Sequence, residues 1–526
     1  MEFQDYPVHE KYLGVYMSRK HLLKSTGIIG SATALSRILG FVRDIVIAAF
    51  FGTAIYAQAF VVAFRIPNLF RDIVGEGATN SALVPVLTEE LSKNGKQSFL
   101  KLSQVLLNIM FVTLLGLTAV GMLASPLIVR LIAPGFLADP EKFRVTVTLT
   151  RALFPFLFLV GLWAYAMGVL NSLGKFASAA FGSCFLNLAM ILSAVMFGEN
   201  VFGLACGVLV GGLLQFLIQL PSLYASGWKA RLTAEFDHPQ ARKAGVLIVP
   251  RVLGACVYQF NVFVSTILAS LSGIVGEGAV AAIYYANRIW QLPLAIFGIA
   301  LAQAALPTMS RHAAGNDMVK LKDTIQFSLK IVFFVLVPSS IGLMMLATPI
   351  TKVLFERGAF TSYSTFITSG ALFFYSFGLV ACGGLKVLAN AFYATGDTRT
   401  PVKAAFYSAI LNLFLNLALM WPLKVGGLTL ANSIAVTFNF VMLYILLVKK
   451  LGDFGTARIK ESFFKVAAAS AAMAIAIKIL MIWLGGYSIV SLFLVMLGGI
   501  ATFFVASFLF GVKEIKEPIE WFKKRR

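Results

Sequence analysis

The sequence predicts an all-α membrane protein with fourteen transmembrane helices, arranged as two parallel six-helix lobes followed by two C-terminal helices. Three observations support this fold class. Of the 526 residues, 59% are hydrophobic and 13% are charged, about half the charged share of a typical soluble domain. Fourteen apolar runs are each long enough to cross a bilayer. Sequence matches at a nearly constant spacing relate the first six runs to the next six, as in transporters built from repeats.

The apolar runs set the number of helices. A bilayer core about 30 Å thick takes roughly 20 apolar residues per helix. The runs bounded by charge, Gly or Pro cover residues 26–51, 54–74, 102–125, 146–170, 177–198, 201–225, 246–272, 279–305, 325–348, 363–394, 401–421, 426–448, 463–484 and 488–511. The mean hydropathy of +0.85 agrees with a chain that has lipid as its main solvent.

The distribution of Lys and Arg orients these helices. With the N-terminus inside, 30 of the 44 basic residues fall in cytoplasmic segments and six fall in outer loops, as the positive-inside rule requires. We therefore expect both termini in the cytoplasm. The predicted parts are a tail (1–25), an N-lobe (26–226), a linker (227–245), a C-lobe (246–450), two further helices (451–512) and a basic C-terminal tail (513–526).

The two lobes are predicted to be parallel repeats. The motif Arg65-Ile66-x-x-Leu69 recurs as Arg288-Ile289-x-x-Leu292, 223 residues later, and Asn187 and Asn412 lie 225 residues apart. Six spans return the chain to the side on which it started, so the repeats share one orientation.

The composition also excludes several classes of function. The net charge of +21 could suggest nucleic acid, but no hydrophilic stretch is long enough to fold into a basic module. The four cysteines each lie alone in an apolar segment, and the four histidines fall in polar connections. We expect no disulfide framework, no metal site, no cofactor and no phosphate-binding loop of the Gly-Lys-Ser/Thr type.

Four basic residues near the cytoplasmic ends of spans, Arg71, Lys330, Lys403 and Lys465, are counted with the cytoplasmic segments. Eight others fall inside the spans: Arg37, Arg43, Arg65, Arg151, Arg251, Arg288, Lys386 and Lys478. A cation in a membrane helix is costly unless it reaches the interface, pairs with an acid or faces a water-filled cavity. Asp44 is the one acid well inside the fourteen spans, and Asp72 lies at the cytoplasmic end of the second span, so pairing partners are scarce.

The positions of these cations divide them into two groups. Arg65, Arg151 and Lys478 lie where they could extend to the interface and hold a helix end, whereas Arg37, Arg43 and Arg288 lie further along their spans. Arg71 fits either interpretation, because it precedes a glycine-rich bend at 75–78. Arginine binds phosphate through a planar two-pronged group, so an arginine-lined pocket poor in acids predicts a phosphate or pyrophosphate ligand.

A cationic cavity inside a hydrophobic shell suits a lipid with a phosphorylated head. The last two helices, rich in Leu, Ile, Val, Phe and Met, are either plain lipid-facing surface or a groove for the lipid tail. Composition alone leaves both alternatives open.

Several motifs together resemble the MurJ (MviN) family of lipid II flippases, within the MOP exporter superfamily. They are the segment Ser36-Arg37-Ile38-Leu39-Gly40-Phe41-Val42-Arg43-Asp44, Pro67-Asn68-Leu69-Phe70-Arg71, Gly75-Glu76-Gly77-Ala78, Ala133-Pro134-Gly135-Phe136, Tyr284-Tyr285-Ala286-Asn287-Arg288, and the segment from Phe392 to Lys403. The resemblance runs from about Met17 to the C-terminus.

The resemblance implies a MATE-like fold of two lobes in a V, with the last two helices forming a groove for an undecaprenyl tail. It implies that the substrate is lipid II, whose pyrophosphate docks on cavity residues. Matched position by position, these residues are Arg37, Arg43, Arg71, Arg288 and Lys386. Gating or support of the cavity would fall to Asp44, Gln58, Gly75, Glu76, Gly77 and Asn287.

Two departures from the family pattern concern the gate. Some members carry an Asp at the positions of Gln58 and Asn287, where this chain has neutral amides. Gating through ion pairs at these positions is therefore not expected here. Sodium coupling is not supported either, because a cation site in the C-lobe would depend on Asn261, Asn390, Asn412 or Asn416 and on backbone carbonyls.

The prediction is therefore a lipid II flippase of the bacterial inner membrane, a transporter and not an enzyme. We expect it to work as a monomer by alternating access, driven by membrane potential or an ion gradient, with membrane lipids and lipid II as its partners and no nucleic acid. The alternatives are a flippase for another undecaprenyl-linked glycan and a MATE-type cation or drug antiporter. An enzyme acting on polyprenyl phosphates would need acids to hold Mg²⁺, and Asp72, Glu76 and Asp397 are too dispersed for that.

Overall fold

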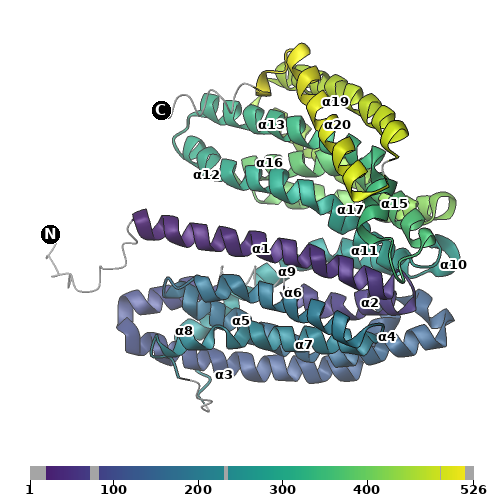
Figure 1. The fold of residues 1–526 in the computed structure, drawn as a ribbon. Helices are drawn as coiled ribbons and strands as arrows, with labels where there is room; N and C mark the ends of the chain where they lie inside the picture. The colour runs from purple at the N-terminus through teal and green to yellow at the C-terminus, as the bar shows by residue number, and fades with distance from the viewer. Residues whose placement is uncertain (1–18, 72–81, 230–234, 486, 516–526) are drawn as a thin grey trace, which may run out of the picture. The chain divides into compact units, whose positions relative to one another are not determined.

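The computed structural model describes residues 19–71, 82–229, 235–485 and 487–515, and these residues form helices and no strand (Figure 1). They divide into two compact units. Unit 1 comprises residues up to 50 together with 59–131 and 139–260, and unit 2 comprises 51–58, 132–138 and 261 onward. The domain limits predicted from sequence remain predictions.

Unit 1 contains the first eight helices and the start of the ninth. They are α1 (Arg19–Phe51), α2 (Ile55–Phe70), α3 (Val84–Ile132), α4 (Pro140–Leu153), α5 (Pro155–Ser172), α6 (Ala177–Phe197), α7 (Val201–Leu217), α8 (Leu220–Tyr224) and α9 (Pro239–Ala269). The boundary between the units falls inside α9, after Phe260. The first four residues of α2 are assigned to unit 2.

Unit 2 contains the remaining elements. They are η3 (Pro134–Ala138), α10 (Ser272–Val275), α11 (Ala279–Pro293), the π-helix η4 (Leu294–Ile299), α12 (Ala300–Ala314), α13 (Met318–Met345), α14 (Ala347–Phe355), α15 (Ser362–Ser376), α16 (Leu379–Ala394), α17 (Arg399–Leu423), α18 (Val425–Leu451), α19 (Thr456–Leu484), α20 (Ile489–Leu509) and η5 (Lys513–Ile515). The last two long helices pack against each other and against α13 (Figure 1).

Local sequence determines where several helices begin. The carboxylate of Asp139 accepts hydrogen bonds from the backbone N–H groups of Glu141 and Lys142, each at 3.1 Å, and Pro140 opens α4. Ser488 and Ser491 form a capping box at the start of α20. Such caps satisfy the backbone donors that the first helical turn leaves unpaired. Pro155 opens α5, which divides the predicted span 146–170 into two helices.

The described residues contain ten helices or continuous helical stretches long and apolar enough to cross a membrane. The bent pair of α15 and α16, with 44° between its halves, raises this number to eleven. Each of the fourteen predicted spans overlaps a helix, and the three spans outside the eleven fall on α1, α2 and α9. The chain is therefore a multi-pass all-α membrane protein, as predicted, whereas the count of fourteen remains a prediction.

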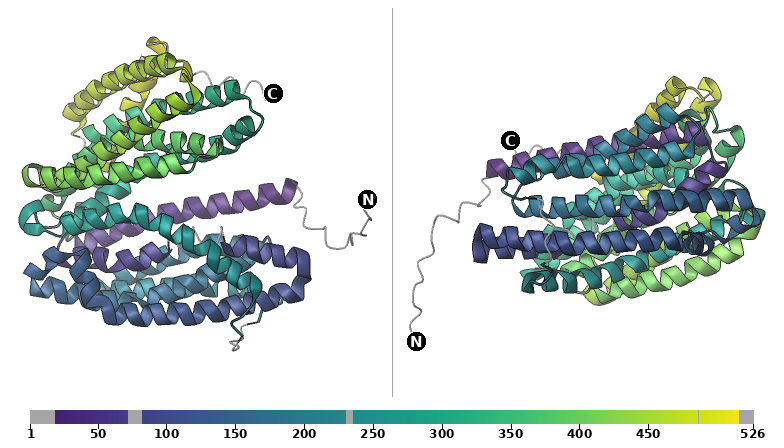
Figure 2. Two further views of the ribbon diagram at one scale, coloured as in Figure 1. Left: turned by 180° about the vertical axis from the view of Figure 1, so that it is seen from behind. Right: turned by 90° about the horizontal axis from the view of Figure 1, so that it is seen from below.

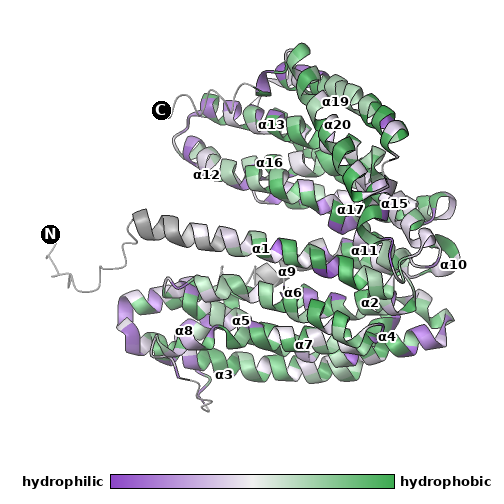
Figure 3. Ribbon diagram, viewed as in Figure 1, coloured by the Kyte–Doolittle hydropathy of each residue, from purple (hydrophilic) through white to green (hydrophobic). Residues whose placement is uncertain are grey.

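Hydrophobic side chains cover much of the helical surface. Figure 3 shows hydrophobic residues along most of the helices and hydrophilic residues gathered near several helix ends. Leu123 and Trp483, for example, are 81% and 84% exposed. A helix in lipid satisfies its own backbone hydrogen bonds and presents apolar side chains outward, so this exposure is expected of a membrane protein.

The core of unit 1 includes part of the segment predicted as a linker. Trp228, Ala241 and Ala244 are buried in a cluster with α3 and α5. The indole of Trp228 donates to Tyr165 Oη at 2.9 Å, and Tyr165 donates to the carbonyl of Ser103 at 2.7 Å. The start of α9 is also joined to α3 by an ion pair between Lys243 and Glu89, at 2.5 Å. Figure 2 shows α3 running along the length of unit 1.

Two turns from the first part of the chain belong to unit 2. In one turn, the hydroxyls of Thr53 and Ser364 are 2.8 Å apart. In the other, the N–H of Gly135 donates to Ser270 Oγ at 3.1 Å. A Cβ at Gly135 would overlap the carbonyl of Ser270, which explains why this close turn uses glycine.

Candidate functional site

The best-defined part of the predicted site is a hydrogen-bonded group around Arg43 on α1. Arg43 is 6% exposed and Asp44 is 1% exposed. The guanidinium donates from Nη2 and Nε to Asp44 Oδ1, at 2.7 and 3.1 Å, and from Nη1 to Asn187 Oδ1, at 2.9 Å. Nη1 also lies 4.0 Å from the sulfur of Met190. A buried arginine is thus held by one carboxylate and one carboxamide.

Asn187 lies on α6 and connects that helix to α1. Its Nδ2 donates to the backbone carbonyl of Ser36 at 3.0 Å. One turn earlier on α6, the thiol of Cys184 faces the carbonyl of Ala32 at 3.7 Å. A Cβ at Gly40 would lie 3.6 Å from Asn187 Nδ2, an ordinary van der Waals distance. Asn187 therefore both packs against α1 and is hydrogen-bonded to it.

Arg37 and Arg43 are six residues apart on the same helix. At 3.6 residues per turn their side chains leave the helix axis about 120° apart. The structure agrees, because Arg37 is exposed whereas Arg43 is buried. Arg65 and Arg71, on and just after α2, are both half-buried.

Unit 2 holds the other predicted basic residues. Arg288 on α11 is half-buried, donates from Nη2 to Tyr284 Oη at 3.2 Å, and lies over the Tyr284 ring, 4.8 Å from its centroid. An aromatic face stabilises a guanidinium without neutralising it. Lys386 on α16 is exposed. The π-helix η4 follows α11 directly, and such interruptions often occur at functional sites.

The structure brings together only part of the predicted constellation. Arg43 and Asp44 are in direct contact, whereas Arg288 and Lys386 belong to the other unit. Gln58 is buried and Asn287 is half-buried. Gly75, Glu76 and Gly77 lie outside the described residues. The binding and gating roles of all these residues remain predictions.

Sequence reasoning did not identify Asn187 as part of the site. Asn412 is its counterpart in the second repeat, but the two amides have different partners: Asn412 Oδ1 accepts from Asn416 Nδ2 at 2.8 Å. Asn390, one of the four amides on which a C-lobe cation site would depend, donates to the carbonyl of Ala302 at 2.7 Å. A polar residue at a fixed repeat position inside an apolar helix was the available signal.

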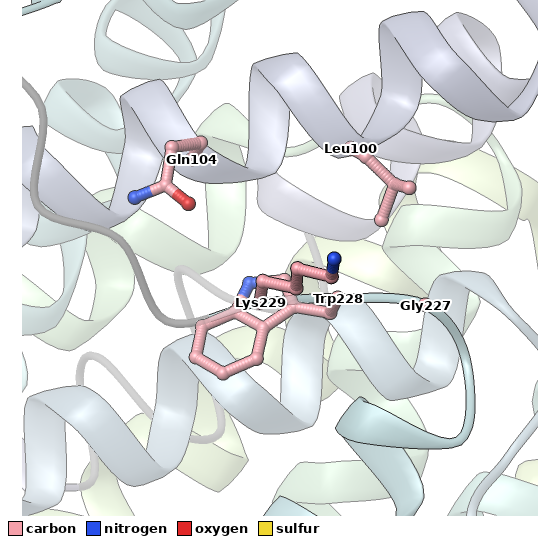
Figure 4. A pocket seen from close by; sticks show the side chains of 5 residues that line it. All are labelled: Leu100, Gln104, Gly227, Trp228 and Lys229. Carbon is pink, nitrogen blue, oxygen red and sulfur yellow. The ribbon is translucent and has the colours of Figure 1, made fainter.

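A small pocket lies elsewhere in unit 1, away from the Arg43 group. It is lined by Leu100, Gln104, Gly227, Trp228 and Lys229 and has a volume of about 210 Å³ (Figure 4). Its single cation, Lys229, is accompanied by apolar and neutral groups. The pocket contains none of the predicted site residues.

Comparison with known sequences identifies the family. A family model described as lipid II flippase MurJ matches residues 47–498. A probable lipid II flippase MurJ from Bdellovibrio bacteriovorus is 32% identical over 518 residues, covering 95% of this chain and 97% of the relative. The lipid II flippase MurJ of Burkholderia cenocepacia is 33% identical over 438 residues, covering 82% of this chain and 84% of the relative.

Solved structures agree with the sequence comparison. A structure of lipid II flippase MurJ in an inward closed conformation covers 93% of this chain and 99% of its own, with a TM-score of 0.77 and 26% identity. An inward-facing multidrug resistance MATE transporter of the MOP superfamily covers 81% of this chain and 96% of its own, with a TM-score of 0.67 and 15% identity. The second likeness concerns the fold alone and confirms the predicted fold class. From the family match and the full-length relatives, the chain belongs to the lipid II flippase MurJ family.

Proposed function

We propose that this protein moves lipid II from the inner to the outer leaflet of the bacterial cytoplasmic membrane by alternating access. The names of its relatives support the substrate. The observation that carries the mechanism is the buried guanidinium of Arg43, which stands in a membrane helix with Asp44 as its counter-anion. A guanidinium paired with a carboxylate can bind a phosphate when the phosphate displaces that carboxylate.

In this proposal Asp44 is paired with Arg43 until the substrate binds and displaces the carboxylate. The carboxylate takes the Nε and Nη2 positions, the edge through which arginine binds phosphate oxygens in two-pronged fashion. Leaving a buried charge unpaired costs several kcal/mol. When pyrophosphate replaces the carboxylate, the positive charge of the guanidinium stays paired with an anion. Binding and release of the substrate therefore both avoid the cost of an unpaired buried charge.

The remaining predicted residues extend this binding site. We assign pyrophosphate capture to Arg37, Arg43, Arg71, Arg288 and Lys386. The support for this assignment is that Arg37 and Lys386 are exposed and Arg71 and Arg288 are half-buried. We assign gating or support of the cavity to six further residues: Asp44, Gln58, Gly75, Glu76, Gly77 and Asn287. Because Gln58 and Asn287 are neutral amides, the gate relies on hydrogen bonds and packing at these two positions.

The other parts of the proposal concern the lipid tail, the two lobes and the energy source of transport. The helices within 451–512 hold the undecaprenyl tail. The N-lobe (26–226) and the C-lobe (246–450), which the linker 227–245 joins, carry out alternating access. Both termini face the cytoplasm, the protein acts as a monomer, and membrane potential or an ion gradient drives transport.

The test is transport by purified protein in vesicles that contain fluorescent lipid II, with outward exposure followed by enzymatic modification of the exposed head group. We expect the wild-type protein to expose lipid II and Arg43→Ala and Arg288→Ala to abolish exposure while remaining folded. Arg151→Ala is the matched control, because Arg151 is an exposed arginine on α4 that is assigned no part in the proposed site. Normal transport by both Arg43→Ala and Arg288→Ala would overturn the proposal.

The same assay separates this function from two others. A flippase for another undecaprenyl-linked glycan would leave lipid II unmoved and would rescue a strain that lacks a capsule or O-antigen flippase. A cation antiporter would accumulate a cationic dye. Asp44, the buried acid of α1, is already paired with Arg43, which disfavours cation binding at this position.

A further inference from the structure

We propose that Asn187 is the positioning residue for Arg43, holding its guanidinium against α6 while the counter-anion is exchanged. This inference rests on the proposed function. Asn187 is 6% exposed. Its two polar atoms have opposite partners: Oδ1 accepts from Arg43 Nη1 at 2.9 Å, and Nδ2 donates to the carbonyl of Ser36 at 3.0 Å.

These two contacts fix the orientation of the amide. A carboxamide has an acceptor at one end and donors at the other, and a flipped amide would place its donors against the donors of Arg43. The carbonyl of Ser36 belongs to the backbone of α1 and is a fixed point of that helix. Asn187 therefore ties both the guanidinium and its parent helix to α6.

The ion pair between Arg43 and Asp44 does not perform this task. Asp44 follows Arg43 directly on α1, so their ion pair moves with that helix and does not fix it against a neighbour. The contacts of Arg43 with α6 run through Nη1, to Asn187 Oδ1 and to the sulfur of Met190. Of these two groups the carboxamide is much the stronger acceptor.

The two partners also use different nitrogens of the guanidinium. Asp44 binds Nε and Nη2, whereas Asn187 binds Nη1. A phosphate that displaces Asp44 therefore leaves the Asn187 contact intact. The neutral acceptor does not compete with the substrate as a second carboxylate would, which is the chemical reason for an amide at this position.

The second half of the chain provides a comparison. Asn412 occupies the corresponding repeat position, and its Oδ1 accepts from the amide of Asn416. A buried Asn at this position thus serves a guanidinium in unit 1 and another amide in unit 2. The positioning role belongs to the first repeat.

The test measures lipid II affinity, transport and thermal unfolding for three variants. Asn187→Leu removes both hydrogen bonds at similar volume, and Asn187→Asp adds a second carboxylate beside Arg43. We expect each to weaken lipid II binding about tenfold or more, since hydrogen bonds to a charged group are worth enough for that change. Ser36→Ala is the control, because it keeps the backbone carbonyl that accepts from Nδ2 at 3.0 Å and removes only the longer contact of Nδ2 with Ser36 Oγ, at 3.4 Å. This variant should bind lipid II nearly as well as the wild type.

A double variant separates positioning from a merely structural role. In Asn187→Asp with Asp44→Asn, the guanidinium again faces one carboxylate and one amide. We expect this double variant to bind lipid II several-fold better than Asn187→Asp alone. A double variant no better than Asn187→Asp, or an Asn187→Leu that binds and transports normally while the wild type flips lipid II, would overturn the inference. Failure of the wild type to flip lipid II would instead refute the proposed function.

Discussion

Two nitrogens of Arg43, Nη2 and Nε, donate to a single oxygen of Asp44, Oδ1, at 2.7 and 3.1 Å. The two residues are neighbours in sequence, and their side chains are 7% and 2% exposed. The cost of burying this arginine in the apolar half of α1 is thus offset by the next residue of the same helix.

Asp44→Asn should lower the stability of the protein when no substrate is bound. It should also increase the stabilisation that substrate binding gives. Losing one partner of a buried ion pair costs about 3–5 kcal/mol, and a pyrophosphate ligand would restore the missing charge. We expect a lower melting temperature in detergent and a larger rise than in the wild type when undecaprenyl pyrophosphate is added. Equal melting temperatures and equal ligand shifts would show that Asp44 is not the counter-anion.

Gly135→Ala should destabilise the protein by about 1–3 kcal/mol, the usual cost of overpacking. The added Cβ would overlap the carbonyl of Ser270, so backbone must move. Gly342→Ala is the matched control, because no atom lies within 4 Å of a Cβ there. In helix α13 the control should be neutral or stabilising by about 0.5–1 kcal/mol. Thermal unfolding of the purified proteins distinguishes the two.

The C-terminal helices should depend on a buried ion pair. Glu514 is 2% exposed, lies 3.2 Å from Lys330 Nζ on α13, and accepts from Ser462 Oγ on α19 at 2.8 Å. Lys330→Met or Glu514→Gln alone should each cost about 1–3 kcal/mol, because the remaining group loses its partner. The double variant should cost less than the sum of the two.

An exposed pair supplies the control for this cycle. Lys465 and Glu461 lie 2.7 Å apart on the surface of α19, with side chains 36% and 60% exposed. Lys465→Met should change stability by less than about 1 kcal/mol. Strict additivity of the Lys330 and Glu514 variants would exclude a coupled pair.

Asp397 should give a pH-dependent contribution to stability. The backbone N–H and the hydroxyl of Thr400, with Lys450, lower the pKa of Asp397 from 3.8 to about 2. A lowered folded-state pKa stabilises the fold above the unfolded pKa, and this contribution is lost as the pH falls from about 4 to about 2. Asp397→Ala should therefore cost about 1 kcal/mol at pH 7, the usual size for a side chain that accepts from a backbone N–H at the start of a helix, and less at pH 3. A difference in melting temperature that is unchanged between pH 7 and pH 3 would contradict this.

The helices were predictable because twenty apolar residues in a row have few alternatives in a bilayer. Each predicted span overlaps a helix, from α1 to α20. The assignment of turns and linkers was not predictable. Burial of Trp228 depends on Tyr165, and the turn around Thr53 packs on Ser364, 311 residues away. Hydropathy carries no information about such distant partners.

The site was predictable in residue type and less so in geometry. The scarcity of acids in the spans draws attention to Asp44, but it does not predict a bond to Arg43, because consecutive helical side chains point in different directions. The buried Arg43 is hydrogen-bonded to Asn187, 144 residues further along the chain. Periodicity could separate Arg37 from Arg43 by angle, but it could not show which of the two faces α6.

The assignment of the turns 51–58 and 132–138 to unit 2 has a consequence for biosynthesis. The ribosome synthesises these turns long before Ser270 and Ser364, the residues with which they form hydrogen bonds. Unit 1 also remains incomplete until Ala241 and Ala244 of α9 have emerged, because both are buried in its core. A nascent chain cut after residue 226 therefore contains neither a finished first unit nor the partners of its turns. Insertion must keep the early helices together in the membrane until α9 and α15 are made.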